Sequence, residues 1–189
     1  FISKKNLINK NNNNFVIGCL SRFDKKKGME YLVRSLPFLD KKFILILAGP
    51  DYGYRAEIIN IVNSLNLNNR VFIFNFLDKK MKESFFNTID LFALPSFSEN
   101  FGNVFLESLQ RGKPILTSFN TPFQDVEKNN CGVVVKLVLK DIIFKIAKIQ
   151  KMNKLNLKNN SLKYAEKFNK QKITILYKKM YDQIHKQKY

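Results

Sequence analysis

Short apolar runs alternate with amphipathic segments along most of the chain, and this alternation limits the fold more than any other feature of the sequence. An apolar run of about four to eight residues is typical of a buried strand, whereas apolar residues every three or four positions are typical of a helix packed on a sheet. We expect strands at residues 15–20, 42–49, 70–76, 91–96, 113–118 and 132–136. Strands that alternate with helices predict an α/β fold, with a doubly wound parallel sheet of about six strands and helices on both faces.

The helices are expected between these strands and after the last one. Between residues 29 and 36, apolar side chains stand at positions i, i+3, i+4 and i+7, so one helical face is apolar. Similar spacing recurs at residues 58–65 and 81–89, and from residue 139 the pattern predicts three helices with a break near residues 151–160. Ligands of doubly wound sheets bind beyond the carboxyl ends of the strands, so the loops after the apolar runs are the places to search for a site.

The composition indicates one domain with a single core. The 189 residues are 45% hydrophobic and include 18 Phe, which is enough to fill a core without disulfide or metal support. The longest apolar stretches are too short to span a membrane. Residues 1–14 start with Phe and lack the apolar core of a secretory signal, so we interpret them as a linker remnant before a domain at 15–189. Cys19 and Cys131 form no C-x-x-C motif, which favours a reducing cytoplasm.

The formal charge of +18 admits two interpretations. A basic excess of this size is typical of nucleic-acid binders and of proteins held near anionic membranes. However, Lys and Asn are scattered through every polar segment, and neither a zinc-finger spacing nor a sustained basic helix face is present. We therefore expect no specific nucleic-acid binding, and we keep as alternatives a peripheral attraction to an anionic inner membrane face or to a polyanionic substrate.

The loop after the first expected strand carries two cations, Arg22 and Lys27, just before a helix that starts near Gly28. Cations at a strand-to-helix junction, beside exposed backbone N–H groups, suit a phosphate or a diphosphate. The alternative is a solvated basic turn in a lysine-rich protein, and the loop alone does not exclude it.

The loop after the fourth expected strand reads SFSENFGNVFLE and contains two acids, Glu99 and Glu107. Gly102 permits a close backbone approach, and the first amides of the following helix, from Phe101 to Val104, can receive an anion. A carboxylate accepts hydrogen bonds from two neighbouring hydroxyls of a sugar. Acids on both sides of a group of amides thus match a nucleotide-sugar, although a helix-capping Glu99 and a solvated Glu107 are the alternatives.

Other kinds of site have less support. His185 is the only histidine, which argues against a Ser-His-Asp triad and against a histidine-rich metal site, so no metal site is expected. Ser96 and Ser98 lack the Gly-x-Ser-x-Gly motif of a nucleophilic serine. Neither a Gly-x-Gly-x-x-Gly nor a Walker loop follows the first strand, which disfavours NAD binding and P-loop ATP hydrolysis.

Four stretches together resemble the donor-binding half of the family-4 retaining glycosyltransferases, which have the GT-B fold. In chain order these are LSRFDKKKG, LAGPDYGYRAEI, DLFALPSFSENFGNVFLESLQRGKPILTS and TPFQDVEKNNCGVVV. The resemblance extends over about residues 15–135, and YAEKFNKQKITILYKKMY at 164–181 is similar to the closing helices of the family. A GT-B enzyme has two Rossmann-like halves, and the resemblance assigns this chain to the C-terminal one.

The resemblance also implies roles for individual residues. Arg22 and Lys27 would hold the diphosphate of the donor, and Glu107 would bind its ribose hydroxyls. Glu99 would orient the transferred sugar together with the backbone of the following residues, which are Asn100, Phe101, Gly102, Asn103 and Val104. The base would lie around Asn75, Phe76 and Leu77, largely against backbone. The donor would be a UDP-sugar, a GDP-sugar or another nucleoside-diphosphate-sugar, used without a cofactor and transferred with retention to a sugar, lipid-linked or polysaccharide acceptor.

Two departures from the family pattern stand out. Asn75 replaces a usual Gly, and Ser21 precedes Arg22 where many members have Gly. In addition, no residues correspond to the N-terminal acceptor half, so we expect a fragment or a protein whose other half is supplied separately. The alternative is a noncatalytic nucleotide-sugar-binding module or partner subunit.

Overall fold

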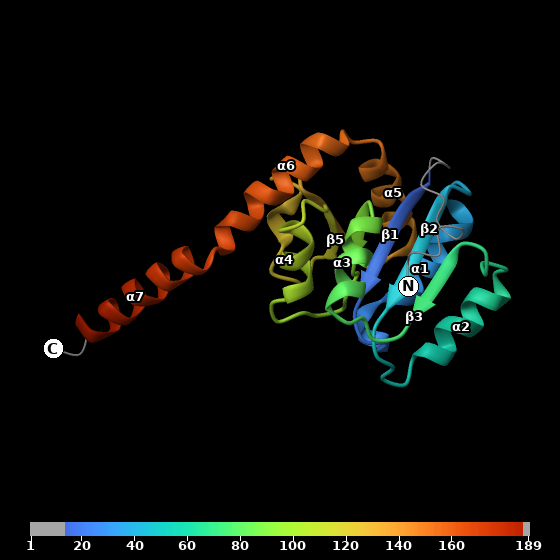
Figure 1. The fold of residues 1–189 in the computed structure, drawn as a ribbon, viewed down its shortest axis with the longest axis horizontal. Helices are drawn as coiled ribbons and strands as arrows, with labels where there is room; N and C mark the ends of the chain where they lie inside the picture. The colour runs from blue at the N-terminus through green and yellow to red at the C-terminus, as the bar shows by residue number, and fades with distance from the viewer. Residues whose placement is uncertain (1–13, 187–189) are drawn as a thin grey trace.

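The computed structural model describes residues 14–186, and Figure 1 shows them as one twisted sheet between helices, with a long C-terminal helix that extends away from the body. The expected linker at residues 1–14 lies outside the described residues, except for Asn14.

The sheet has six parallel strands in the order β3-β2-β1-β4-β5-β6. The strands are β1 (Phe15–Leu20), β2 (Phe43–Ala48), β3 (Val71–Phe74), β4 (Leu91–Ala93), β5 (Ile115–Ser118) and β6 (Gly132–Val135). This is the strand order of a doubly wound dinucleotide-binding sheet, whose order reverses between the two central strands. The predicted fold class is confirmed, and the reversal places the loops after β1 and β4 next to each other.

The strands are apolar because both faces of the sheet are covered. Every residue of β2, β4, β5 and β6 is buried, as is typical of parallel strands between helical layers. Two of the strands end two or three residues before their expected bounds, because β3 ends at Phe74 and β4 ends at Ala93. As a result Asn75 and Phe76 lie in the loop after β3.

Two helical layers enclose the sheet. The helices are α1 (Met29–Ser35), α2 (Arg55–Ser64), α3 (Lys79–Thr88), α4 (Asn103–Leu109), α5 (Leu139–Gln150), α6 (Lys154–Ala165) and α7 (Lys170–Lys186), with short 3-10 turns at Lys25–Lys27, Leu36–Phe38, Gln124–Val126 and Glu166–Phe168. Helix α1 contacts both α2 and α5, whereas α4 contacts α6. The predicted apolar helix faces are buried, as Met29, Leu32 and Val33 show in α1.

The three expected C-terminal helices are present, but the break between the first two is shorter than predicted. Helix α5 ends at Gln150, and Asn153 caps α6 by accepting a hydrogen bond from the backbone N–H of Asn156. The lysine- and asparagine-rich residues 154–160 are therefore helical. In the part of the chain that the structure describes, no helix is long and apolar enough to cross a membrane.

Candidate active site

The loops after β1 and β4 touch each other at Gly28 and Pro95. Gly28 has a left-handed backbone with φ of 65°, and a Cβ at this position would lie 2.1 Å from the carbonyl oxygen of Pro95. Only glycine allows both this conformation and this approach. The close contact brings the basic turn at Lys25–Lys27 against the loop that begins after β4.

Hydrogen bonds to the carbonyl of Lys26 fix the second loop on the first. The backbone N–H of Phe97 donates to this oxygen over 2.8 Å, and the hydroxyl of buried Ser96 lies 3.0 Å from it. The same hydroxyl lies 2.9 Å from the carbonyl oxygen of Ser98. Ser96 therefore has no role as a nucleophile here, and its hydrogen bonds instead set the position of the loop.

This packing places Lys27 and Glu99 in an ion pair. Lys27 Nζ donates a hydrogen bond to Glu99 Oε1 over 2.6 Å, and each side chain is only 13% exposed. The predicted alternative, in which Glu99 caps the following helix, does not match this geometry. Helix α4 instead has Gly102 as its N-cap, with a left-handed φ of 72°.

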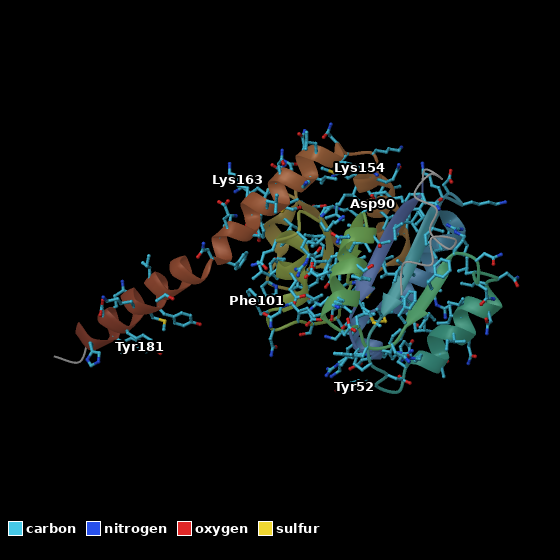
Figure 2. All side chains as sticks on the ribbon, in the orientation of Figure 1. Tyr52, Asp90, Phe101, Lys154, Lys163 and Tyr181 are labelled. Atoms are coloured by element: carbon cyan, nitrogen blue, oxygen red, sulfur yellow. The ribbon has the colours of Figure 1, made fainter. Side chains whose placement is uncertain are left out.

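Arg22 stands at the outer edge of the same site. Its Nε lies 3.3 Å from Asp24 Oδ2, and its guanidinium stacks 5.0 Å from the centre of the Tyr52 ring. The Arg22 side chain is 45% exposed, so it remains accessible to a ligand. Figure 2 shows Tyr52 beyond the carboxyl ends of the strands, with Asp90 and Lys154 at the opposite edge of the sheet.

A cleft of about 470 Å³ lies between these loops. Among the predicted site residues, those that line it are Arg22, Lys27, Glu99, Asn100, Phe101, Gly102 and Asn103. Lys26 and Ser98 also line it, so the cleft combines basic side chains with the Glu99 carboxylate. Within the described residues, the backbone N–H groups of Phe101, Gly102, Asn103 and Val104 donate no hydrogen bond, and so they are available to an acceptor.

Glu107 lies one turn into α4 and does not line this cleft. Its Oε2 lies 2.6 Å from Lys82 Nζ of α3, in an ion pair without hydrogen-bond alignment, so this buried oxygen accepts no hydrogen bond among the described residues. The sequence pattern gave no sign of Lys82. Its charge is one of many on the helix surface, and only the packing of α3 beside α4 distinguishes it.

The predicted base-binding residues follow β3. Asn75 and Phe76 have exposed side chains, whereas Leu77 is 6% exposed and belongs to the core. A ligand can therefore meet Leu77 only through its backbone. Arg55, which is absent from the residues predicted above, donates a hydrogen bond to Asn75 Oδ1. Arg55 is the first residue of α2, the helix that follows β2. Lys27 was predicted as a site residue because it lies between a strand and a helix, and the same criterion would have identified Arg55.

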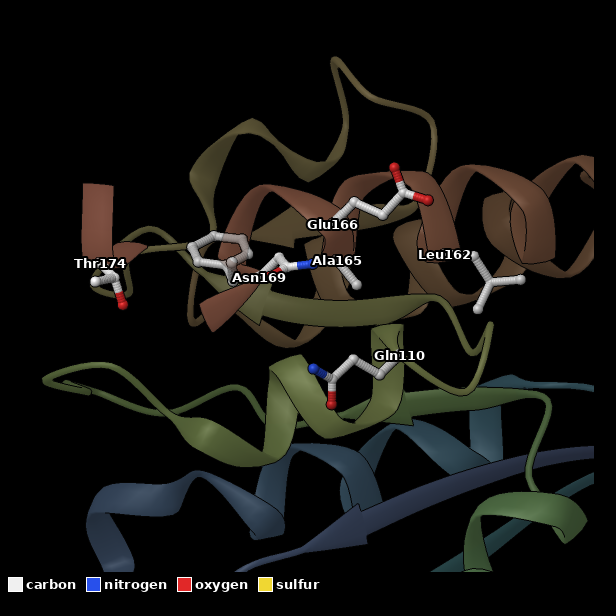
Figure 3. A pocket seen from close by; sticks show the side chains of 7 residues that line it. Gln110, Leu162, Ala165, Glu166, Asn169 and Thr174 are labelled. Atoms are coloured by element: carbon white, nitrogen blue, oxygen red, sulfur yellow. The ribbon is translucent and has the colours of Figure 1, made fainter. Parts of the chain in front are cut away.

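A larger hollow of about 810 Å³ lies elsewhere, between α4 and the junction of α6 with α7 (Figure 3). Gln110 faces it from the end of α4, and Leu162, Ala165 and Glu166 line it from α6 and from the 3-10 turn that follows α6. Among the described residues, Glu166 is the only charged side chain in its lining. The described lining thus lacks the cations that a diphosphate requires, and we take the smaller cleft as the candidate site.

The described residues show neither a metal site nor a reactive thiol. Across residues 14–186, no group of three or more His, Cys, Asp or Glu side chains is arranged to hold a metal ion. Cys19 is fully buried, and desolvation raises the pKa of its thiol well above the ordinary value. A buried thiol of this kind is not a nucleophile.

The sequence of residues 2–174 matches the family model described as "Glycosyl transferases group 1". The chain belongs to this family. The O-antigen biosynthesis glycosyltransferase WclY of Escherichia coli is 27% identical over 171 residues, which are 90% of this chain and 47% of that protein. The chain therefore spans about half the length of this relative.

Solved structures of glycosyltransferases agree with this membership. Anabaena Alr3699/HepE in complex with UDP-glucose has a TM-score of 0.72 and 25% identity, covering 92% of this chain and 52% of that one. The C-terminal domain of a glycosyl transferase group 1 family protein (LpcC) from Francisella tularensis has a TM-score of 0.70 at 15% identity, covering 85% of this chain and 90% of that domain. The predicted resemblance is confirmed, because the fold is that of the C-terminal half of a GT-B glycosyltransferase.

Proposed function

We propose that this glycosyltransferase domain binds a nucleoside-diphosphate-sugar and supports transfer of the sugar, with retention, to an acceptor in polysaccharide, lipopolysaccharide or glycoconjugate assembly. The observation that carries this proposal is the Lys27–Glu99 ion pair, at 2.6 Å, in a cleft lined by Arg22 and by helix amides. A cation suited to phosphate and a carboxylate suited to sugar hydroxyls stand side by side, and this arrangement matches a nucleotide-sugar, whose phosphate is bonded to its sugar.

The donor would cross the carboxyl ends of the strands. The diphosphate would contact Lys27 and Arg22, the sugar would lie near Glu99 and residues 100–104, and the base would lie beyond β3, near Asn75. The ribose would reach Glu107, whose buried Oε2 has no hydrogen bond in the described structure. A ribose hydroxyl would donate to this oxygen the hydrogen bond that the ion pair with Lys82 does not supply.

The chemistry would depend mainly on charge. When the glycosidic bond to the phosphate breaks, the departing diphosphate gains negative charge, and preorganised cations and amides stabilise that charge as it develops. Lys27 and Arg22 would supply the cations. Glu99 would orient the sugar through its hydroxyls rather than exchange a proton with it.

Thermal unfolding of the 189-residue chain with UDP, UDP-glucose, GDP and GDP-mannose tests donor binding. A ligand at a concentration of 100 times its dissociation constant stabilises the native state by about 2.7 kcal/mol, so protection by at least one ligand is expected. Glu107→Ala should remove most of this protection. Glu166→Ala, which changes a glutamate of the other hollow, should leave it unchanged. If no uridine or guanosine derivative protects the chain, the proposal fails.

A noncatalytic nucleotide-sugar-binding module is the second candidate, because the residues that line the candidate cleft are assigned to the donor and none of them to an acceptor. Joining or co-expressing an N-terminal half from a relative separates the two. Donor-dependent transfer supports the enzyme, whereas binding with persistent inactivity supports the module.

A further inference from the structure

Arg55 is held rigidly across the carboxyl ends of two strands. One terminal nitrogen, Nη2, donates to the Gly49 carbonyl over 2.6 Å, and the other, Nη1, donates to Asn75 Oδ1. The guanidinium also stacks on the buried ring of Phe23, at 4.3 Å from its centre. Its Nε is buried and makes no hydrogen bond with the described residues. The terminal nitrogens and the stacking therefore fix the guanidinium plane.

This contact determines which way the amide of Asn75 faces. Arginine has five N–H donors and no acceptor, so it can meet only the oxygen of the amide. The amide nitrogen of Asn75 must then face away from Arg55. The side chain is exposed, and its nitrogen donates to no other group among residues 14–186. Just after β3, the chain thus presents N–H donors in a fixed orientation.

We propose that Asn75, oriented by Arg55, reads the exocyclic group of the donor base and selects a keto base over an amino base. This inference rests on the proposed function, which places the base near Asn75. The O4 of uracil and the O6 of guanine are acceptors, and so they match the amide N–H. The corresponding amino groups of cytosine and adenine are hydrogen-bond donors. They would face the N–H donors of the Asn75 amide and form no hydrogen bond with them. Asn75 acts as a specificity-determining residue, and Arg55 as its positioning residue.

Calorimetric titration of the 189-residue chain with UDP, CDP, GDP and ADP tests the inference. We expect UDP to bind about tenfold more tightly than CDP, since a matched hydrogen bond replaces an unpaired one. GDP and ADP form the second comparison, and GDP should bind more tightly than ADP for the same reason. The relative affinities of UDP and GDP tell whether the site accepts uracil, guanine or both.

Variants of Asn75 then test its role directly. Asn75→Ala should bring the ratio of the UDP and CDP dissociation constants to near one, and Asn75→Asp, which offers only acceptors, should reverse the preference towards CDP. Arg55→Met should weaken the preference by freeing the amide. Asn60→Ala, at an exposed position of α2, is the matched control and should leave the ratio unchanged.

The outcomes separate this inference from the proposed function. If the wild-type chain binds none of the four nucleotides, the proposed function fails and the inference falls with it. If the chain binds UDP and CDP equally, or if Asn75→Asp leaves their ratio unchanged, the inference alone is wrong.

Discussion

Lys27 Nζ lies 2.6 Å from Glu99 Oε1, although 72 positions separate the two residues in the sequence. The pair forms because β1 and β4 are neighbours in the sheet, so the loops that follow them share one edge. Each of the two charges is satisfied by the other. The diphosphate of a nucleotide-sugar must therefore compete with the Glu99 carboxylate for Lys27.

Glu99→Gln should change the binding of the diphosphate and of the sugar in opposite directions. Without the carboxylate, Lys27 is free to meet a phosphate, and UDP should bind about threefold more tightly, a gain of the size that a partly exposed ion pair supplies. UDP-glucose should lose most of its advantage over UDP, because a neutral amide with one acceptor oxygen replaces the carboxylate that receives the sugar hydroxyls. Isothermal titration with both ligands measures this, and unchanged affinities would show that Glu99 does not face the donor.

Gly28→Ala should separate the two loops. The new Cβ would overlap the carbonyl of Pro95 at 2.1 Å and would impose a side chain on a φ of 65°. We expect the free energy of unfolding to fall by about 3 kcal/mol. Chemical denaturation measures the loss.

Gly53→Ala is the matched control for this substitution. Gly53 also has a positive φ, of 86°, but a Cβ added there would meet no atom of the described residues within 4 Å. Only the backbone strain of about 1 kcal/mol therefore applies. Equal losses in the two variants would contradict the loop contact.

Ser96→Ala should weaken the site without removing any group that meets the ligand. The change deletes the hydroxyl contacts with the carbonyls of Lys26 and Ser98 and should cost about 1 to 2 kcal/mol of stability. UDP binding should weaken because the loop that carries Glu99 is no longer held in place beside Lys27. Ser64→Ala, which removes a similar hydroxyl bond to Ile61 on α2, should lower stability but leave the UDP affinity intact.

Acid should destabilise the C-terminal region through Asp125. Although partial burial opposes the effect, hydrogen bonds from Tyr164 and Lys167 lower the pKa of this carboxyl below its ordinary value of 3.8. The unfolded state then binds the proton at a higher pH than the folded state. The contribution to stability is therefore fully present above about pH 4 and is lost as the pH falls through the lowered folded value.

Thermal unfolding between pH 7 and pH 3 checks this expectation. Asp125→Asn should be less stable than the wild type at pH 7 and should lose less stability on acidification. Asp182→Asn, at an exposed position of α7, should follow the wild-type curve. A wild-type curve without any loss between pH 4 and pH 3 would argue against the Asp125 contacts.

Hydrophobic patterning predicted the elements well where burial alone decides them. The run at 42–49 forms β2 within one residue at each end, because every side chain of the strand is buried. The run at 70–76 predicts the end of β3 less accurately, because the strand stops two residues earlier than expected. Leu77 is buried although it lies beyond the strand, and Phe76 is 72% exposed although it is apolar, so hydrophobicity could not locate the end at Phe74.

The helix over residues 154–165 is a case in which the local pattern predicted too little regular structure. Its polar, lysine-rich start indicated a break, yet the segment is helical. Asn153 caps it, and Leu157 and Tyr164 are buried on the side that faces the body. The contact of α6 with α4 is a long-range interaction, and no local pattern contains it.

Periodicity is a local property, and it predicted the parallel α/β sheet and the two loops that contain Arg22, Lys27, Glu99 and Glu107. The family was predicted from the resemblance of four sequence stretches, and the family model confirms it. The pairing of Lys27 with Glu99, of Glu107 with Lys82 and of Arg55 with Asn75 became known from the folded chain alone. Each of these pairs joins loops or helices from different strand-helix units. The order of the strands in the sheet, rather than distance along the chain, sets which of those units meet.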